Sequence, residues 1–254
     1  MLFKDLTLSA VLLLAFFLES GFIIGGMATY VANRHAEMQV KKARWFKFFT
    51  YFLITHCMVL AASAGGTLFS LITIVLTVGG AFEILNASLH SQFSNPFIPA
   101  SACGLYFLAI AGTIFFAAHA SSGAALYVYL ILCILDGFSQ IVGQLIGKHR
   151  LSSAISPNKT IEGAASGAVF AIVTAIVFRS FVRFDFIQAL LCGVLLSCAG
   201  IFGDLLASCY KRLCGIKDYS SLLPGQGGIV DRFNSFFAAA PVFYVYIFVL
   251  NGLK

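Results

Sequence analysis

The sequence predicts an all-α fold: a polytopic integral membrane protein with about eight transmembrane helices. Of its 254 residues, 60% are hydrophobic and only 10% are charged, and the mean hydropathy is +0.95. Soluble domains carry about 25% charged residues, so one soluble globule could not bury this much apolar surface. The same composition excludes a disulfide-rich scaffold, a disordered chain and a nucleic-acid-binding domain.

Eight apolar segments are long enough to cross a bilayer, which takes roughly 20 residues each. They are residues 7–32, 46–64, 67–89, 97–118, 122–146, 162–182, 185–207 and 233–251. Pro96 and Pro99, next to and within the start of the fourth segment, leave open a re-entrant stretch over 90–104, which would change the number of membrane crossings.

The first segment is expected to be a retained span and not a signal peptide. Residues 6–31 are too long for the apolar region of a signal peptide, lack an A-x-A-like cleavage site, and carry Glu19 in their middle. In the first and sixth segments, small residues four apart predict close helix contacts, namely Gly21 with Gly25 and Gly163 with Gly167.

Four carboxylates lie within apolar segments, where an unpaired charge is costly, so each is a functional candidate. Glu19 favours a structural interpretation. Glu83 is intermediate, because Asn86 and His90 share its helical face. The four carboxylates are Glu19, Glu83, Asp136 and Asp204.

Asp136 and Asp204 belong to polar stripes with spacings of three and four, which place each stripe on one face of its helix. Both stripes lead into charged loops, so a functional role is favoured for both acids. The stripes are Asp136, Gln140, Gly143 and Gly147, and Ser197, Gly200, Asp204, Ser208 and Lys211.

The distribution of basic residues predicts the orientation. The loops 33–47, 147–161 and 208–232 carry 12 of the 16 lysines and arginines. The positive-inside rule therefore predicts that these loops face the cytosol and that both termini lie outside.

One membrane domain over residues 1–254 is the simplest division, with an N-terminal helical part over 1–120 and a functional part over 121–254. The two long loops of the second half hold most of its glycine, proline and charge. No internal repeat suggests an inverted-repeat transporter. Seven cysteines without a C-x-x-C pair and five scattered histidines indicate packing residues and no zinc site.

The loop after the seventh segment combines cations, carboxylates and glycines within residues 208–235. Carboxylates are ligands for Mg²⁺, lysine and arginine neutralise phosphate, and glycines let backbone N–H groups approach it. Together they predict a polyphosphate bound through a metal. Taken singly, the charges fit a solvated loop and the glycines a flexible turn.

This loop resembles the signature of the phosphatidate cytidylyltransferases, or CDP-diacylglycerol synthases, which reads S-x-x-K-R-x-x-x-x-K-D, a small residue, P-x-H-G-G and D-R-x-D. Upstream, the run from Ser156 to Gly163 is similar to the family motif S-P-K-K-T-x-E-G. The resemblance covers roughly the C-terminal half. The matching signature residues are Ser208, Lys211, Arg212, Lys217, Asp218, Ser220, Pro224, Gly227, Gly228, Asp231 and Arg232.

Three departures from the family pattern bear on chemistry. Gln226 stands where the family has histidine, and glutamine carries neither a proton nor a positive charge at neutral pH. Asn234 replaces the last aspartate of the signature, and Asn158 replaces a lysine. These residues are either auxiliary, or they mark a divergent member with an altered substrate or a reduced rate.

The resemblance implies transfer of CMP from CTP to phosphatidic acid, giving CDP-diacylglycerol and pyrophosphate. It implies that the catalytic loops lie in the cytosol and that Mg²⁺ is the cofactor, with a second cation left open. It also implies that the protein lies in the lipid bilayer, binds no nucleic acid and, by analogy, forms a homodimer.

The resemblance also implies roles for individual residues. Asp204 and Asp231 would hold the metal, with Asp218 as a further ligand. The catalytic set is Lys211, Arg212, Lys217, Asp218 and Arg232, and the substrate-binding set is Asp136, Ser156, Lys159, Thr160, Ser208, Gly225, Gln226, Gly227 and Gly228.

Two alternatives stay open. A related enzyme could use another lipid phosphate, such as a polyprenyl or ether-linked one, or could use CTP to phosphorylate a lipid alcohol. A transporter or a non-catalytic relative could bind an ion through its intramembrane acids.

Overall fold

The computed structural model describes residues 8–64, 66–91 and 97–252. Within these residues it contains eight α-helices, one short 3₁₀ helix and a two-stranded hairpin. In chain order they are α1 (Leu8–Ala32), α2 (Met38–Ala64), α3 (Gly66–Leu89), α4 (Phe97–His119), α5 (Ser122–Ile146), β1 (Arg150–Ser152), β2 (Ser156–Thr160), α6 (Ile161–Val177), η1 (Arg179–Phe181), α7 (Phe186–Leu213) and α8 (Ile229–Gly252).

The prediction of an all-α polytopic membrane protein is confirmed. A helix lies at each predicted segment, and seven of them are long and apolar enough to cross a membrane. The sixth prediction, 162–182, was too long. The helix α6 has 17 residues, because the chain turns into η1 and then into Arg183, which has a left-handed φ of 55°.

Several helices extend beyond their apolar stretch. The helix α2 starts at Met38 and includes four basic residues before its apolar part, and α7 continues to Leu213 through Lys211 and Arg212. Lysine and arginine are good helix formers, so the apolar length marks the bilayer crossing and not the helix end. Pro99 lies inside α4, so no break occurs after residue 97, and Pro96 lies outside the described residues.

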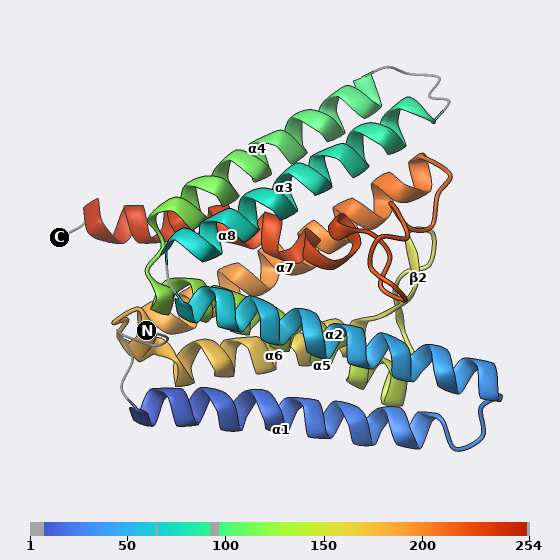
Figure 1. Cartoon of the computed structure of the whole chain (residues 1–254), viewed down its shortest axis with the longest axis horizontal. Coiled ribbons are helices and arrows are strands. Elements are labelled where there is room, and N and C mark those ends of the chain that lie inside the picture. Colours follow the sequence, from blue (N-terminus) through green and yellow to red (C-terminus); the bar gives the residue numbers. More distant parts are fainter. Residues whose placement is uncertain (1–7, 65, 92–96, 253–254) are drawn as a thin grey trace.

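Most of the loops that carry basic residues gather at one end of the bundle. Figure 1 shows the α1–α2 turn, the β1–β2 hairpin and the α7–α8 loop at the same end. The predicted topology requires this arrangement. Which side of the membrane this end faces stays a prediction.

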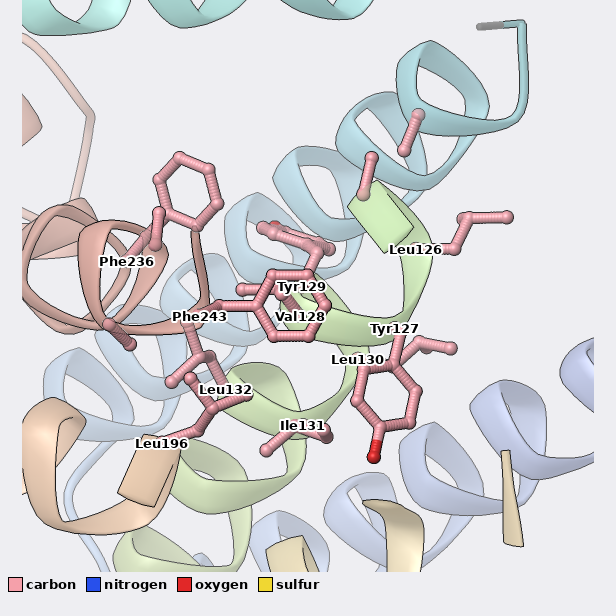
Figure 2. Close-up of a cluster of buried hydrophobic side chains, with 14 of the residues drawn as sticks. Leu126, Tyr127, Val128, Tyr129, Leu130, Ile131, Leu132, Leu196, Phe236 and Phe243 are labelled. Carbon is pink, nitrogen blue, oxygen red and sulfur yellow. The ribbon is translucent and has the colours of Figure 1, made fainter. Parts of the chain in front are cut away.

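The core of the bundle is the first half of α5. Leu126, Tyr127 and Val128 are fully buried one after another, as expected for a helix that is apolar all round. Figure 2 shows this segment with Phe243 of α8 and Leu196 of α7. Asp136 therefore follows, on the same helix, the most tightly buried segment of the molecule.

Glycine allows α6 to lie directly on α5, as predicted for Gly163 and Gly167. A Cβ at Gly167 would lie 2.5 Å from the carbonyl oxygen of Leu135, and one at Gly163 would lie 2.5 Å from that of Ser139. For the pair Gly21 and Gly25, the prediction was wrong at Gly21, whereas a Cβ at Gly25 would lie 3.4 Å from the ring of Phe48 of α2. A Cβ at Gly21 would meet nothing within 4 Å, because this part of α1 faces a cavity.

We expect Gly167→Val to lower the free energy of unfolding by about 1–3 kcal/mol, because the added atoms overlap the backbone of α5. The control is Gly104→Val, at a helical glycine whose Cβ would meet nothing within 4 Å. Thermal unfolding in one detergent compares the two variants. Equal losses in Tm would contradict the close α5–α6 contact.

Candidate active site

Two intramembrane carboxylates are joined by consecutive residues of α8. The Asn234 side-chain amide donates to Asp204 Oδ1 at 3.0 Å, and the Ser235 hydroxyl donates to Asp136 Oδ1 at 3.2 Å. The helices α5, α7 and α8 thus bring together acids that are 68 residues apart in the sequence. Close packing permits this, because Gly203 of α7 lies against the backbone of Asn234.

The hairpin supplies a cation to this pair. Lys159 of β2 forms an ion pair with Asp204 Oδ2, and both side chains are about 30% exposed. The end of the hairpin is fixed because the Thr160 hydroxyl accepts the backbone N–H of Gly163 at 3.1 Å and so caps α6. Asp136 is also acted on by the charges of Asp204, Arg232 and Lys159, so these four groups form one electrostatic cluster.

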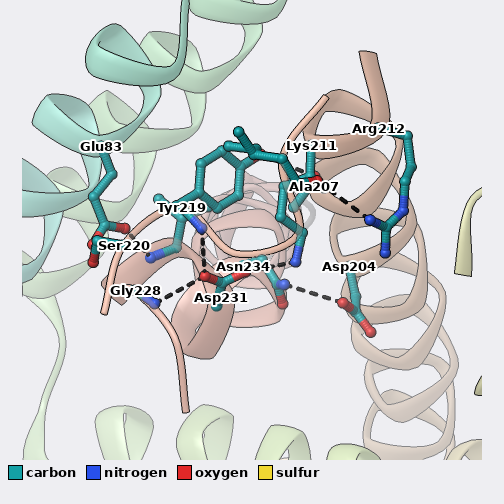
Figure 3. Close-up of polar contacts among 12 residues, drawn as sticks. Glu83, Asp204, Ala207, Lys211, Arg212, Tyr219, Ser220, Gly228, Asp231 and Asn234 are labelled. Atoms are coloured by element: carbon teal, nitrogen blue, oxygen red, sulfur yellow. Dashed lines mark hydrogen bonds and ion pairs between the residues drawn. The ribbon is translucent and has the colours of Figure 1, made fainter. Parts of the chain in front are cut away.

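Asp231 forms a second cluster, drawn in Figure 3. Its side chain is 4% exposed, and Lys211 Nζ lies 2.5 Å from its Oδ1. Its Oδ2 accepts the backbone N–H groups of Tyr219 and Gly228, each at 2.8 Å. Asp231 therefore ties the long loop to the start of α8, a role that its place in the signature did not indicate.

The glycines serve the turn in front of α8. Gly225 and Gly227 have φ values of 71° and 84°, a region that other residues rarely adopt. A Cβ at Gly227 would lie 2.7 Å from the Asp231 carboxylate. The N–H of Gly228 points at Asp231, so these glycines first build the loop that any phosphate would meet.

Glu83 of α3 caps α8 from the side. Its carboxylate is buried and accepts the backbone N–H groups of Ile229 and Val230, each at 2.9 Å, and the hydroxyl of Ser220 at 2.6 Å. A carboxylate at a helix N-terminus satisfies free N–H groups and interacts well with the helix dipole. The sequence left Glu83 undecided, because its partners lie more than 130 residues away.

Other predicted site residues support the loops or lie apart from the acids. Arg212 donates to the carbonyl oxygens of Ile155 and Ile216, each at 3.2 Å, so it joins the hairpin to the long loop. Lys217 and Asp218 are exposed, Ser208 is buried and Ser156 is half-buried. Among the predicted residues, those that the structure brings together around acids are thus Asp136, Lys159, Asp204 and Arg232 in one cluster, and Lys211, Gly228 and Asp231 in the other.

Tyr219 anchors the loop from inside. Burial, with the neighbouring Asp231 carboxylate, raises the pKa of Tyr219 above its ordinary value. Its hydroxyl therefore stays neutral and donates to the carbonyl oxygen of Ala207 at 2.9 Å.

Two polar atoms near Asp231 are buried without a partner in the described part of the chain. They are Arg232 Nε and Gln226 Oε1. Gln226 uses its amide nitrogen to donate to the carbonyl oxygen of Lys47 at 2.6 Å, and the Arg232 guanidinium lies 5.9 Å from the ring centre of Tyr51. An unsatisfied buried N–H is costly, and a hydrogen-bond acceptor beside Arg232 Nε would remove that cost.

The two predicted metal ligands, Asp204 and Asp231, lie in separate clusters, each paired with a lysine. Within residues 8–64, 66–91 and 97–252, no three acidic, histidine or cysteine side chains cluster closely enough to hold a metal by themselves. Mg²⁺ commonly uses only one or two carboxylates and takes its other ligands from phosphate and water. Asp204 has one donor on each oxygen, whereas Asp231 has one donor on Oδ1 and two on Oδ2, so Asp204 keeps the larger acceptor capacity.

Comparison with known proteins agrees with the resemblance and extends it. The model of the family described as "Cytidylyltransferase family" matches residues 3–250. It therefore covers the N-terminal helices, where the sequence alone had shown only hydrophobicity.

Individual relatives match over part of their length. The phosphatidate cytidylyltransferase of Staphylococcus haemolyticus is 38% identical over 168 residues, and that of Staphylococcus aureus is 37% identical over 168 residues; each alignment covers 64% of this chain and 64% of the relative. That of Staphylococcus saprophyticus is 41% identical over 119 residues, or 46% of each chain. The matched stretch is thus just under two thirds of the length of the first two.

We expect Glu83→Gln to lower the free energy of unfolding by about 1–3 kcal/mol, because the amide removes the charge that interacts with the N-terminus of α8. Glu37→Gln is the control, since Glu37 is exposed in the turn between α1 and α2. That variant should change stability by less than about 0.5 kcal/mol.

Thermal unfolding and amide hydrogen exchange over residues 219–235 compare the two variants. Unchanged exchange in Glu83→Gln would contradict the role of Glu83 as the cap of α8.

Proposed function

The chain belongs to the cytidylyltransferase family, and from this premise we propose that it transfers CMP from CTP to phosphatidic acid, giving CDP-diacylglycerol and pyrophosphate. The two staphylococcal relatives are phosphatidate cytidylyltransferases, which supports this substrate pair. The structural observation that supports it is the cluster of Asp136, Asp204, Lys159 and Arg232 at the basic end of a membrane bundle. The two cations of such a cluster can reduce the repulsion between an anionic lipid and a polyanionic nucleotide.

In the proposed reaction, a phosphate oxygen of the lipid attacks the α-phosphorus of CTP. The new P–O bond forms as the bond between the α-phosphorus and the oxygen that bridges it to the β-phosphorus breaks. Pyrophosphate leaves with the electron pair of the broken bond. The attacking phosphate is already anionic at neutral pH, so no strong general base is needed. Positioning and charge neutralisation therefore dominate the work of the protein.

The residues of the chain would divide this work. Lys159, held by Asp204, presents its ammonium group at the centre of the cluster. Arg232 carries an unpaired Nε, which can donate to a phosphate oxygen. Lys211 is already engaged by Asp231, so it would fix the loop while its remaining N–H groups face the substrate.

We also propose that Asp204 and Asp231 hold Mg²⁺, which when bound would neutralise the triphosphate and make its α-phosphorus more electrophilic. A second cation and a homodimer stay predictions from the resemblance.

The departures from the family pattern fit this chemistry. Asn234 donates to Asp204, a contact that an ionised aspartate could not make. Gln226 is held by the backbone of Lys47. Neither position needs a proton-carrying group in the proposed reaction.

The cytosolic placement of the site is a further proposal. It rests on the 12 basic residues in the loops 33–47, 147–161 and 208–232, and on CTP being water-soluble. We also propose the division into an N-terminal helical part, 1–120, and a catalytic part, 121–254. Asp136, Asp204 and Asp231 all belong to the second part, while Glu83 and Lys47 of the first part hold its loop in place.

The two alternatives differ from this proposal in measurable ways. An enzyme for another lipid phosphate would release pyrophosphate only with that lipid, and a kinase-like relative would release CDP. A transporter would show no turnover with any lipid.

We expect the purified protein with CTP, Mg²⁺ and dioleoyl phosphatidate to release pyrophosphate only when the lipid is present. Asp204→Asn should lower kcat by about a hundredfold or more, because Lys159 loses its counter-charge and the proposed metal site loses a ligand. The matched control is Asp185→Asn at the N-cap of α7, where asparagine caps equally well.

A coupled pyrophosphate assay, with Tm measured in parallel, gives both rates. Full activity in Asp204→Asn would contradict the proposed role of this carboxylate.

A further inference from the structure

A cavity of about 260 Å³ lies between α1, α2 and α5, next to the candidate active site. Three cations from α2 and α8 line it, together with apolar side chains from α1 and α5. The cations are Arg44, Lys47 and Arg232, and the apolar residues include Phe17, Leu18, Phe22, Ile134, Phe138 and Ile141.

The lining of this cavity is cationic, and the carboxylates that act on its cations, Asp136 on Arg232 and Asp218 on Lys47, lie outside it. None of its lining residues, all of them in the described part of the chain, is acidic. Among the described residues Arg232 Nε, a donor, is buried without a partner. Lys47 is acted on by the positive charges of Arg232 and Lys217 and by the negative charge of Asp218, so cations outnumber carboxylates around it. A phosphate would satisfy the free donor and offset this excess of positive charge.

The other side of the cavity suits a hydrocarbon chain. Phe17, Leu18 and Phe22 of α1 face Ile134 and Phe138 of α5 across it. Figure 1 shows α1 at the edge of the bundle, and its outer face exposes large apolar side chains such as Phe16 and Ile23. One helix therefore separates the cavity from the bilayer.

The cavity also adjoins the acidic cluster. Gly137 lines it, and Asp136 is the preceding residue of α5. Arg232 lines it from α8, two residues before Asn234, which donates to Asp204. An anion held by Arg232 would thus lie beside the carboxylates of the candidate site.

We propose that this cavity binds the lipid substrate, a phosphate monoester that carries acyl chains. This inference rests on the proposed function. The phosphate lies at Arg232, Lys47 and Arg44, and the first part of a chain lies between α1 and α5. The cavity is smaller than ordinary pockets for drug-sized ligands, about 300–1,000 Å³, so the rest of the lipid remains in the bilayer beside α1.

The test uses the full-length protein and either fills the cavity with a larger side chain or removes one of its positive charges. Gly21→Leu adds a side chain at a glycine that lines the cavity and where a Cβ would meet nothing within 4 Å, so it fills part of the space proposed for the acyl chain. Lys47→Gln removes one positive charge at the head end. Each variant should raise the KM for phosphatidate about tenfold and leave the KM for CTP unchanged, since uniform binding of only one substrate is lost.

The controls make the same changes outside the cavity. Gly104→Leu lies on α4, where a Cβ also meets nothing within 4 Å, and Lys42→Gln is exposed on α2. Both should keep the parental KM values. A phosphatidate KM that stays within about twofold of the parent in Gly21→Leu and Lys47→Gln would overturn the inference.

Labelling separates this inference from the proposed function. A phosphatidate with a diazirine in one acyl chain should label peptides of α1 and α5, and unlabelled phosphatidate should compete while phosphatidylcholine and inorganic phosphate do not. Gly21→Leu should abolish the label. Competition by inorganic phosphate alone would mean a free-phosphate site and would overturn the inference.

Two further results are decisive. Label outside α1 and α5 in an active enzyme overturns the inference and leaves the proposed function standing. Label in α1 and α5 without lipid-dependent turnover supports the binding site and removes the proposed function.

Discussion

The structure depends on one constraint: carboxylates among apolar helices must find hydrogen-bond donors, and the first two turns of α8 meet most of this need. Backbone N–H groups of residues 229 and 230 hold Glu83, Asn234 holds Asp204, and Ser235 holds Asp136. Asp231, in the same two turns, gathers Lys211 and the loop. Burying an unpaired charge is far more costly than burying a bonded one, so these contacts fix where α8 begins.

This arrangement leaves positive charge available where it matters for the proposed chemistry. Asp204 and Asp231 each hold one lysine, whereas Arg232 Nε is a buried donor with no partner among the described residues. The signature residues thus have two kinds of role. Some, such as Arg212 and Gly227, build the loops. Others, such as Lys159 and Arg232, would present charge to a phosphate in the proposed reaction.

Part of this was predictable from the sequence, and the reasons are physical. Apolar length reports bilayer thickness directly, so the helices fell where the hydropathy indicated, except that the turn at Arg183 shortens α6. Helical spacing placed Asp136 and Asp204 on polar faces. The spacing of residues could not reveal that Glu83 caps α8, or that Gly21 faces a cavity, because both depend on packing between distant segments.

The central claim is that the acidic and basic groups at one end of this bundle join CTP to a lipid phosphate. Phosphorus NMR of the purified protein with CTP, Mg²⁺ and dioleoyl phosphatidate tests it most directly, because it identifies both products. The account predicts a lipid-linked diphosphate diester and pyrophosphate in equal amounts. Formation of CDP, or the absence of any new phosphorus signal under conditions where the protein remains folded, would contradict it.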